Sequence, residues 1–499
     1  MSNLYTCAFL LLLSLICYSL KRTPKLPPGP RGLPIVGNMY QIPRNPWKQF
    51  KEWHRVYGPI FRLRIGQTTV ILIGNHQVAK EILGKRSALY SSRPRLIVAG
   101  ECVAKGLDAG LLPYGPKWKQ FHAIQASFLN ARRCQTYRPL QDVESRHLVF
   151  NLLSTNDFQH ELYRYASSFM FALLYGRRLV GGDEPELDQM ERLITAVFDT
   201  TALGNWWVDA FPMLNCLPRP LARWKLVGDD LHRQQTRLYG SNFDDALNAA
   251  SWNWCKQGVS DEASSCREEL PFVLGDLYGA GSRTTAGALR VAVLACVSYP
   301  DAMRRAQEEL DSTVGSGRLP TFDDVPDLPY VRSFIEEVLR WRPLTPSGVA
   351  HSPTSDDEYG GFFIPRGATV LAANWSLEMD QDVFRSPEAF MPERWIDADL
   401  PLAAFGFGKR TCPGQHLARN SLLLTVPRLL WAFDIKWKQG QAARLDCLPM
   451  TQEGIFSKPG PFEATFTIRS PAHGHVVTRE WQDSDDDVEK MLNAIGRQF

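Results

Sequence analysis

The chain begins with an uncharged, mostly apolar run, Leu4 to Leu20, which is followed directly by Lys21, Arg22 and Lys25. As a helix this run is about 25 Å long, slightly short of a hydrocarbon core of about 30 Å. A cleaved signal peptide is the alternative, but the run lacks a basic residue before it and an A-x-A-like cleavage site after it. The pattern therefore predicts a retained membrane anchor at residues 1–25. Positive charge after the span places the N-terminus in the lumen and the rest in the cytosol, as in a single-pass protein of the endoplasmic reticulum.

Residues 26–34 are rich in proline, which fixes φ and holds the preceding residue in an extended conformation. This segment is predicted to be a stiff hinge between the anchor and the body. Beyond it, no internal repeat, low-complexity tract or second linker divides residues 35–499, so a single domain is expected there.

The hydrophobic residues of the body follow a strand-like period in some segments and a helical period in others. Apolar and arginine residues alternate over residues 61–65, and Gly66 and Gln67 lead into the apolar run 69–73, a pattern typical of a β-hairpin. Helical periodicity broken by Gly and Pro covers most of residues 76–340. Strand patterns return near residues 362–364, 369–372 and 464–469. The predicted fold is mostly α with small β-sheets, an α+β class.

Composition narrows the function without identifying it. Hydrophobic residues at 44% and charged residues at 22% are typical of a globular protein. A net charge of +3 over 499 residues is too small for a nucleic-acid-binding surface. The ten cysteines form no C-x-x-C pair, which excludes a zinc ribbon and a dithiol redox motif and fits a reducing compartment.

Residues 405–414 (Phe-Gly-Phe-Gly-Lys-Arg-Thr-Cys-Pro-Gly) carry the clearest chemical signal. Gly406 and Gly408 permit a tight turn and a close approach of backbone to a flat ligand. Pro413 suits the first position of a helix, which would place Cys412 at a helix N-terminus where a thiolate is stabilised. A single cysteine is more often a small buried hydrophobe, but this sequence context favours a metal ligand.

Two further segments have a recognisable pattern. Glu337 and Arg340 share a helix face, and the apolar residues around them favour burial, although such a pair is often a surface ion pair of little energetic value. Residues 271–300 predict one long helix of about 40 Å. Glycines and the Thr284-Thr285 pair interrupt its middle, where threonine can bend a helix. Close packing of a neighbouring helix is the alternative explanation.

The segment 405–414 resembles the haem-binding signature F-x-x-G-x-R-x-C-x-G of cytochromes P-450, matching it at Phe405, Gly408, Arg410, Cys412 and Gly414. The resemblance implies that Cys412 is the axial thiolate ligand of haem iron and that Phe405 shields it. It also implies that Arg410 pairs with a haem propionate.

The charged pair looks like the family's E-x-x-R motif, and Arg394 looks like the later arginine that completes a structural triad with Glu337 and Arg340. Trp118 and His122 occupy the place of the family's W-x-x-x-R, with His122 as a candidate propionate contact or an ordinary surface histidine. His351 resembles another propionate contact. The similarity extends from Pro27 to about Arg469.

The middle of the long helix resembles the family's distal motif A-G-x-(D/E)-T-T, with Ala280, Gly281, Thr284 and Thr285 in register. The resemblance assigns proton delivery to Thr284. Arg283 stands where the family has an acid, which puts the usual acid–alcohol relay in doubt and makes Arg283 a second candidate catalytic residue.

The resemblance implies a monooxygenase that takes electrons from NADPH through cytochrome P-450 reductase. The basic residues Lys117, Lys119, Arg132 and Arg133 are candidates for docking the reductase, or a solvated face. By family position, residues 95–113, 206–218, 272–281, 344–349 and 454–456 frame an apolar small-molecule substrate. The chain is most similar to microsomal fungal enzymes that modify secondary metabolites such as alkaloids, terpenoids or polyketides.

Three other functions remain open at this point. The same fold can catalyse oxidative coupling, ring closure or desaturation, which the Arg283 substitution would suit. The chain can also be a non-enzymatic haem-binding protein, or a membrane-tethered interaction protein in which Cys412 binds nothing.

Overall fold

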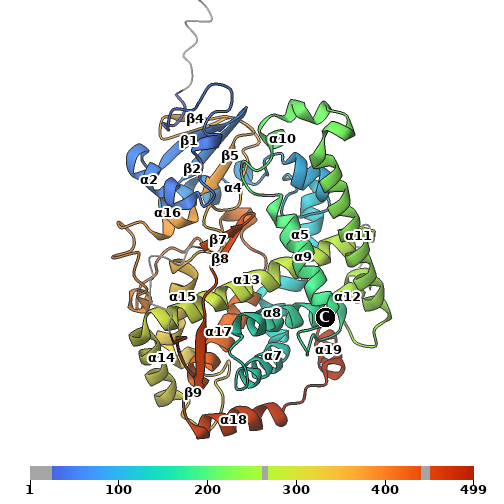
Figure 1. Ribbon diagram of the computed structural model, residues 1–499, viewed down its shortest axis with the longest axis vertical. Helices are drawn as coiled ribbons and strands as arrows, with labels where there is room; N and C mark the ends of the chain where they lie inside the picture. Colours follow the sequence, from blue (N-terminus) through green and yellow to red (C-terminus); the bar gives the residue numbers. More distant parts are fainter. Residues whose placement is uncertain (1–24, 261–267, 440–449) are drawn as a thin grey trace, which may run out of the picture.

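The computed structural model describes residues 25–260, 268–439 and 450–499. The predicted anchor lies outside these residues. Within them, no helix is both long enough and apolar enough to cross a membrane. Helices dominate the described chain and the sheets are small, so the predicted fold class is confirmed (Figure 1).

The largest sheet has three strands in the order β1-β2-β5. β1 (Ile60–Ile65) and β2 (Thr68–Ile73) pair antiparallel, with Ile60 opposite Ile73, which confirms the predicted hairpin. β5 (Thr369–Ala372) lies parallel to β2, so this sheet joins the N-terminal region to a segment some three hundred residues later.

Three two-stranded sheets complete the β structure. They are β3 (Asp357–Tyr359) with β4 (Phe362–Ile364), β6 (Phe433–Trp437) with β9 (Ala464–Ile468), and β7 (Met450–Glu453) with β8 (Phe456–Pro459). β4, β5 and β9 match the predicted strands, whereas β3, β6, β7 and β8 were not predicted.

One long helix, α13 (Leu270–Ser298), crosses the middle of the molecule (Figure 1). It confirms the long helix predicted over residues 271–300 and ends before Pro300, where α14 (Pro300–Thr313) begins. α15 (Pro329–Trp341) ends shortly before Pro343. The other described α-helices of five or more residues are α2 (Trp47–Tyr57), α5 (Pro116–Leu129), α6 (Ala131–Thr136), α7 (Arg138–Asn151), α8 (Phe158–Tyr175), α9 (Pro185–Asp199), α11 (Arg223–Asn248), α12 (Trp254–Ser260), α16 (Asn374–Glu378), α17 (Gln415–Ala432), α18 (Pro471–Gln482) and α19 (Val488–Gly496). Short helices lie at α3 (His76–Ala79), α4 (Ser87–Tyr90) and α10 (Trp207–Ala210).

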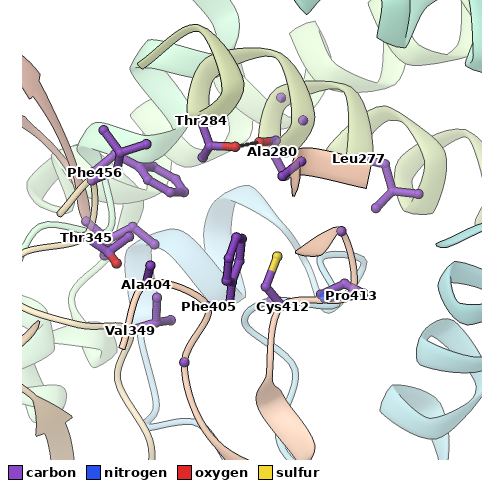
Figure 2. A pocket seen from close by; sticks show the side chains of 18 of the residues that line it. Leu277, Ala280, Thr284, Thr345, Val349, Ala404, Phe405, Cys412, Pro413 and Phe456 are labelled. Atoms are coloured by element: carbon purple, nitrogen blue, oxygen red, sulfur yellow. Dashed lines mark hydrogen bonds between the residues drawn. The ribbon is translucent and has the colours of Figure 1, made fainter. Parts of the chain in front are cut away.

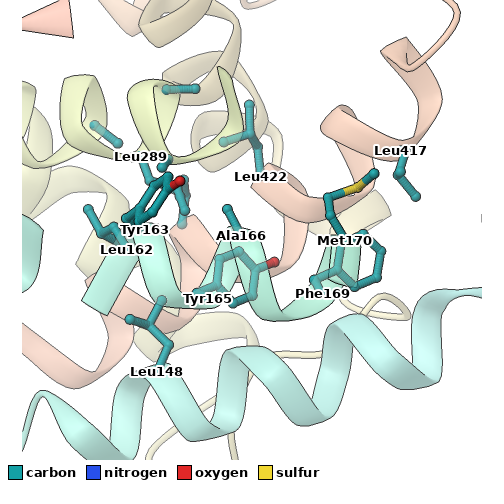
Figure 3. Close-up of a cluster of buried hydrophobic side chains, with 14 of the residues drawn as sticks. Leu148, Leu162, Tyr163, Tyr165, Ala166, Phe169, Met170, Leu289, Leu417 and Leu422 are labelled. Carbon is teal, nitrogen blue, oxygen red and sulfur yellow. The ribbon is translucent and has the colours of Figure 1, made fainter. Parts of the chain in front are cut away.

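The main core lies where α7, α8, α13 and α17 meet (Figure 3). α8 supplies Ala166, Phe169 and Met170 to this cluster. A Cβ placed on Gly281 of α13 would lie 2.6 Å from Met170 Sδ, so this glycine allows the two helices to approach closely. Close helix packing is therefore one reason for the glycines in α13.

The proline-rich segment contains no helix or named strand, and it lies against the body. Arg62 N donates to Pro28 O at 2.8 Å, and Phe363 N donates to Lys25 O at 2.8 Å. The described chain thus begins in contact with β1 and β4.

Candidate active site

The loop before α17 is shaped by two glycines with left-handed backbone. Gly406 has φ +73° and Gly408 has φ +60°. A Cβ on Gly408 would also lie 2.3 Å from Leu83 O. A side chain at this position would therefore strain the backbone and collide with that of Leu83, which confirms the predicted tight turn.

Cys412 lies at the end of this loop, where its N–H donates to Phe405 O at 2.8 Å. The prediction that Pro413 begins the next helix was wrong, because α17 starts at Gln415. Gln415 N donates to Cys412 O at 3.4 Å in a turn that precedes the first helical hydrogen bond, from Ala418 N to Gly414 O at 2.9 Å. Burial raises the pKa of the Cys412 thiol, while the N–H of Gly414 acts in the opposite direction.

A cavity of about 410 Å³ separates this loop from α13. Figure 2 shows the Cys412 sulfur directed across it toward α13, with the Phe405 ring beside the sulfur and Thr284 on the opposite wall. Most of its lining is apolar, as predicted for the substrate. The lining includes Leu277, Ala280, Leu344, Val349, Ile455 and Phe456.

Most of the predicted substrate-framing segments contribute to this cavity, namely those at 95–113, 272–281, 344–349 and 454–456. The prediction for residues 206–218 was wrong. These residues form α10 and a 3-10 helix at the surface, where the Met213 side chain is exposed. α9 takes their place, contributing Ile194, Val197 and Phe198.

Two arginines give one end of the cavity a positive charge. Arg410 donates to three backbone oxygens, those of Ser91, Ala109 and Leu112, at 2.7, 3.2 and 2.6 Å. Arg93 donates to Gly110 O at 2.8 Å and to a second backbone carbonyl. Within the described parts of the chain, neither forms an ion pair or hydrogen bond with a carboxylate.

Burial lowers the pKa of Arg410 to about 9, and the nearby Arg93 lowers it further, while burial lowers the pKa of Arg93 to about 10. Both still carry a charge at neutral pH. Two partly buried cations that no described carboxylate contacts directly, in the same cavity as a thiol, fit a flat group that has two carboxylates and a metal, as haem has. Arg93 was missed in the sequence because it belongs to no motif recognised there, and its role depends on its proximity to Arg410.

Trp118 and the two other predicted propionate contacts, His122 and His351, also line the cavity. The Arg410 guanidinium lies 4.3 Å from the centre of the Trp118 ring, and the His122 ring stacks on Trp118 at 4.8 Å. His351 Nδ1 donates to Tyr90 O at 2.9 Å. Burial, with Arg93 nearby, lowers the pKa of His351 to about 3, so the ring is neutral. A carboxylate beside it would favour a second proton.

The predicted charged triad comes together in the structure. Glu337 accepts Arg340 Nε at 2.8 Å and Nη2 at 2.7 Å, and Arg394 Nε at 3.2 Å. The same carboxylate accepts Met391 N at 2.9 Å and Trp395 Nε1 at 2.8 Å. The Glu337 and Arg340 side chains are 0% exposed, so the alternative of a surface ion pair is excluded.

Thr284 and Arg283 point to different surroundings. Thr284 lines the cavity and donates to Ala280 O at 2.6 Å, the helical back-bond drawn in Figure 2. Arg283 is absent from the lining of this cavity and reaches instead to Glu453 on β7 and to Thr195 Oγ1 at 2.5 Å. A smaller cavity of about 30 Å³ adjoins Arg283 and shares Thr284 with the larger one.

The family model for cytochrome P450 matches residues 27–466. Similar curated proteins include the cytochrome P450 monooxygenase aneD of Aspergillus aculeatus, which is 45% identical over 492 residues, covering 97% of this chain and 96% of that protein. The cytochrome P450 monooxygenase FrzL of Cladobotryum sp is 42% identical over 502 residues, 99% of this chain and 98% of its own. The Echilunin cytochrome P450 monooxygenase of Aspergillus ruber is 38% identical over 491 residues, 96% of this chain and 91% of its own. The matches cover nearly the whole chain, and they agree with a partly buried cysteine that faces a helix across an apolar cavity. The chain therefore belongs to the cytochrome P450 family and is a cytochrome P450 monooxygenase.

Proposed function

We propose that this protein inserts one oxygen atom of dioxygen into an apolar organic substrate held between α13 and the Cys412 loop. The observation that carries the proposal is the Cys412 sulfur at the floor of a mostly apolar cavity, with two unpaired arginines at its edge. The haem that family membership implies supplies the oxygen and electron chemistry when it is bound.

The protein's own residues hold and orient that group. Cys412 would hold its iron through the sulfur, and the Phe405 ring lies beside that sulfur. Arg93 and Arg410 would exchange their carbonyl partners for propionates, and Trp118, His122 and His351 would complete that end. Gly408 and Gly414 keep the loop close to the flat ligand.

The triad of Glu337, Arg340 and Arg394 has a positioning role in this proposal. It ties α15 to residues 391–395, so two segments on the Cys412 side of the molecule are fixed by one buried carboxylate. None of the three residues lines the large cavity, so none touches substrate.

Thr284 is the hydroxyl of α13 that faces the Cys412 loop, and it is proposed to pass protons into the cavity. Arg283 cannot replace the missing acid directly, because its guanidinium is held by Glu453 outside the cavity. In this position Arg283 joins α13 to β7 and fixes the backbone that presents Thr284.

The substrate is proposed to be a fungal secondary metabolite. The similar proteins are fungal monooxygenases, and one of them is named for echilunin. The apolar lining from α9, α13 and residues 344–349 favours a substrate with an extended hydrocarbon body.

Anchoring at the membrane of the endoplasmic reticulum through residues 1–25 is part of the proposal, with the body in the cytosol. Exposed apolar side chains support it, because Ile35 and Tyr40 follow the hinge and the Tyr40 ring lies 6.4 Å from that of Trp207 on α10. Met213 and Leu221 extend this exposed set. Such side chains are suited to contact with lipid.

The proposed electron donor is NADPH-cytochrome P-450 reductase. Two of the predicted docking residues interact with other groups of the protein. Lys117 pairs with Glu269 at 2.7 Å, and Arg133 donates to backbone oxygens at the C-terminus. The Nζ atoms of Lys119 and Lys409 lie 5.5 and 5.1 Å from the centre of the Tyr114 ring, and Lys409 also donates to the Tyr114 hydroxyl at 3.0 Å. These two lysines are the better candidates for an acidic partner.

Family membership sets the non-enzymatic alternatives aside, whereas coupling, ring closure and desaturation remain a second candidate that the Arg283 substitution favours. The test is turnover of an apolar fungal metabolite with reductase, NADPH and isotopically labelled dioxygen. A product carrying one labelled oxygen supports insertion. A product oxidised without gain of oxygen supports the second candidate.

A further inference from the structure

One carboxyl group stands in the wall of the substrate cavity. Asp276 lies on α13, four and eight residues before Ala280 and Thr284, and all three residues line the cavity. Positions separated by four residues lie on one face of a helix. Asp276 thus belongs to the same stripe of α13 as the residues that face Cys412.

In the described parts of the chain, no group donates a hydrogen bond to the Asp276 carboxyl. Its Oδ2 atom is buried without a hydrogen bond, and among the described residues Asp276 forms no ion pair. Burial raises its pKa well above the ordinary value, and the nearby carboxyl of Asp108 adds to this effect. Buried polar groups are nearly always hydrogen-bonded, so an unpartnered carboxyl facing a cavity indicates that a ligand supplies the partner.

Asp108, unlike Asp276, has partners within the protein. It also lines the cavity, but its carboxylate accepts Gly110 N at 2.6 Å and interacts electrostatically with Arg93 and Arg410. The Tyr239 ring lines the same region and interacts with both carboxyls. This end of the cavity therefore has two acidic groups, of which only Asp108 is satisfied by the protein.

We infer that Asp276 binds a positively charged nitrogen of the substrate, so that the substrate is a basic amine carried on an apolar body. Burial disfavours the ionised form of a carboxyl group, and a nearby cation stabilises that form. The adjacent aromatic face of Tyr239 would add to its attraction. The inference deepens the proposed function, since it assumes that this cavity holds the substrate.

The placement also restricts where the substrate is oxidised. Four residues of helix rise separate Asp276 from Ala280, about 6 Å along the axis. Cys412 faces the stretch of α13 from Leu277 to Thr284 in Figure 2. A carbon several bonds away from the nitrogen, rather than the carbon attached to it, would be presented for oxidation.

The test uses purified haem-loaded protein whose reduced carbon monoxide spectrum shows thiolate ligation. Two probes of the same shape are titrated into it and followed in the Soret band. One is trimethyl(3-phenylpropyl)ammonium, which cannot ligate iron and stays charged at every pH, and the other is its uncharged carbon isostere. The ratio of their affinities is measured in the wild type, in Asp276→Asn and in the charge-conserving control Asp276→Glu.

Asp276→Asn is expected to lower the ratio of ammonium to isostere affinity by about 10- to 100-fold, while Asp276→Glu keeps most of the preference. An unchanged ratio in Asp276→Asn overturns the inference. The proposed function would survive that result, because product formation with labelled dioxygen tests it independently.

A second measurement needs no variant. In the wild type the ammonium probe should bind more tightly as pH rises, because the bound cation favours the ionised carboxyl. The titratable groups that interact with Asp276 are Asp108 and the phenols of Tyr239 and Tyr175, and burial holds the pKa of both phenols above the range tested. The affinity for the ammonium probe is measured from about pH 6 to about pH 9. An affinity that stays constant over this range contradicts the inference.

Discussion

Replacing Glu337 by glutamine should severely destabilise the protein. The carboxylate is buried and accepts hydrogen bonds from Arg340, Arg394, Met391 and Trp395. A glutamine keeps the shape of the Glu337 side chain but removes its negative charge. Its NH₂ group would then face the N–H donors that now bond to the carboxylate. Two buried guanidinium groups would then lose their counter-ion.

The expected loss in the free energy of unfolding is about 3–5 kcal/mol, the usual result of removing one partner from a buried ion pair. The neighbouring residue supplies a matched control. Glu336 pairs with Arg419, but the two side chains are 28% and 34% exposed. Glu336→Gln should therefore cost about 1 kcal/mol or less.

The assay is urea unfolding of both variants and the wild type, followed by tryptophan fluorescence, together with the haem content of each purified protein. Glu337→Gln should show an early transition and low haem content, while Glu336→Gln remains close to the wild type. Equal effects of the two substitutions would refute the structural role given to the triad.

Three further predictions concern the loop, the distal helix and a buried acid. Gly408→Ala should lower haem content, because it forces a side chain to φ +60° and within 2.3 Å of a backbone oxygen; haem content equal to the wild type would contradict this. Thr284→Ala should keep the carbon monoxide spectrum but lower product formed per NADPH consumed, by on the order of tenfold or more; unchanged coupling would exclude the proton-delivery role. Burial raises the pKa of Glu378 from 4.5 to about 8, so the folded state binds a proton that the unfolded state releases. The free energy of unfolding should therefore fall as pH rises from 4.5 to about 8 in the wild type, and Glu378→Gln should remove this part of the dependence, as measured by urea unfolding at several pH values.

The sequence predicted those features that depend on local spacing. The hairpin at residues 60–73, the long helix α13 and the buried pair on α15 follow from periodicity and from residues three or four positions apart. The turn around Gly408 was predictable because glycine alone tolerates its φ. The start of α17 was misplaced because Pro413 also suits the turn that precedes the helix.

Features made by distant segments were not predicted. Arg93 meets Arg410 only after the chain folds, and β6 and β7 depend on partners that no local pattern reveals. Arg283 was recognised as unusual, but its partner Glu453 lies 170 residues away. Asp276 was overlooked although a lone acid on an apolar helix face was visible, because only the structure shows that it faces the cavity without a partner.

The central claim is that Cys412 provides the thiolate ligand of the haem. The most direct test is the reduced carbon monoxide difference spectrum of the wild type beside Cys412→Ala, both expressed without residues 1–25. The account predicts a strongly red-shifted Soret band in the wild type and its loss in the variant. The same spectrum in both proteins, or no haem in either, would contradict it.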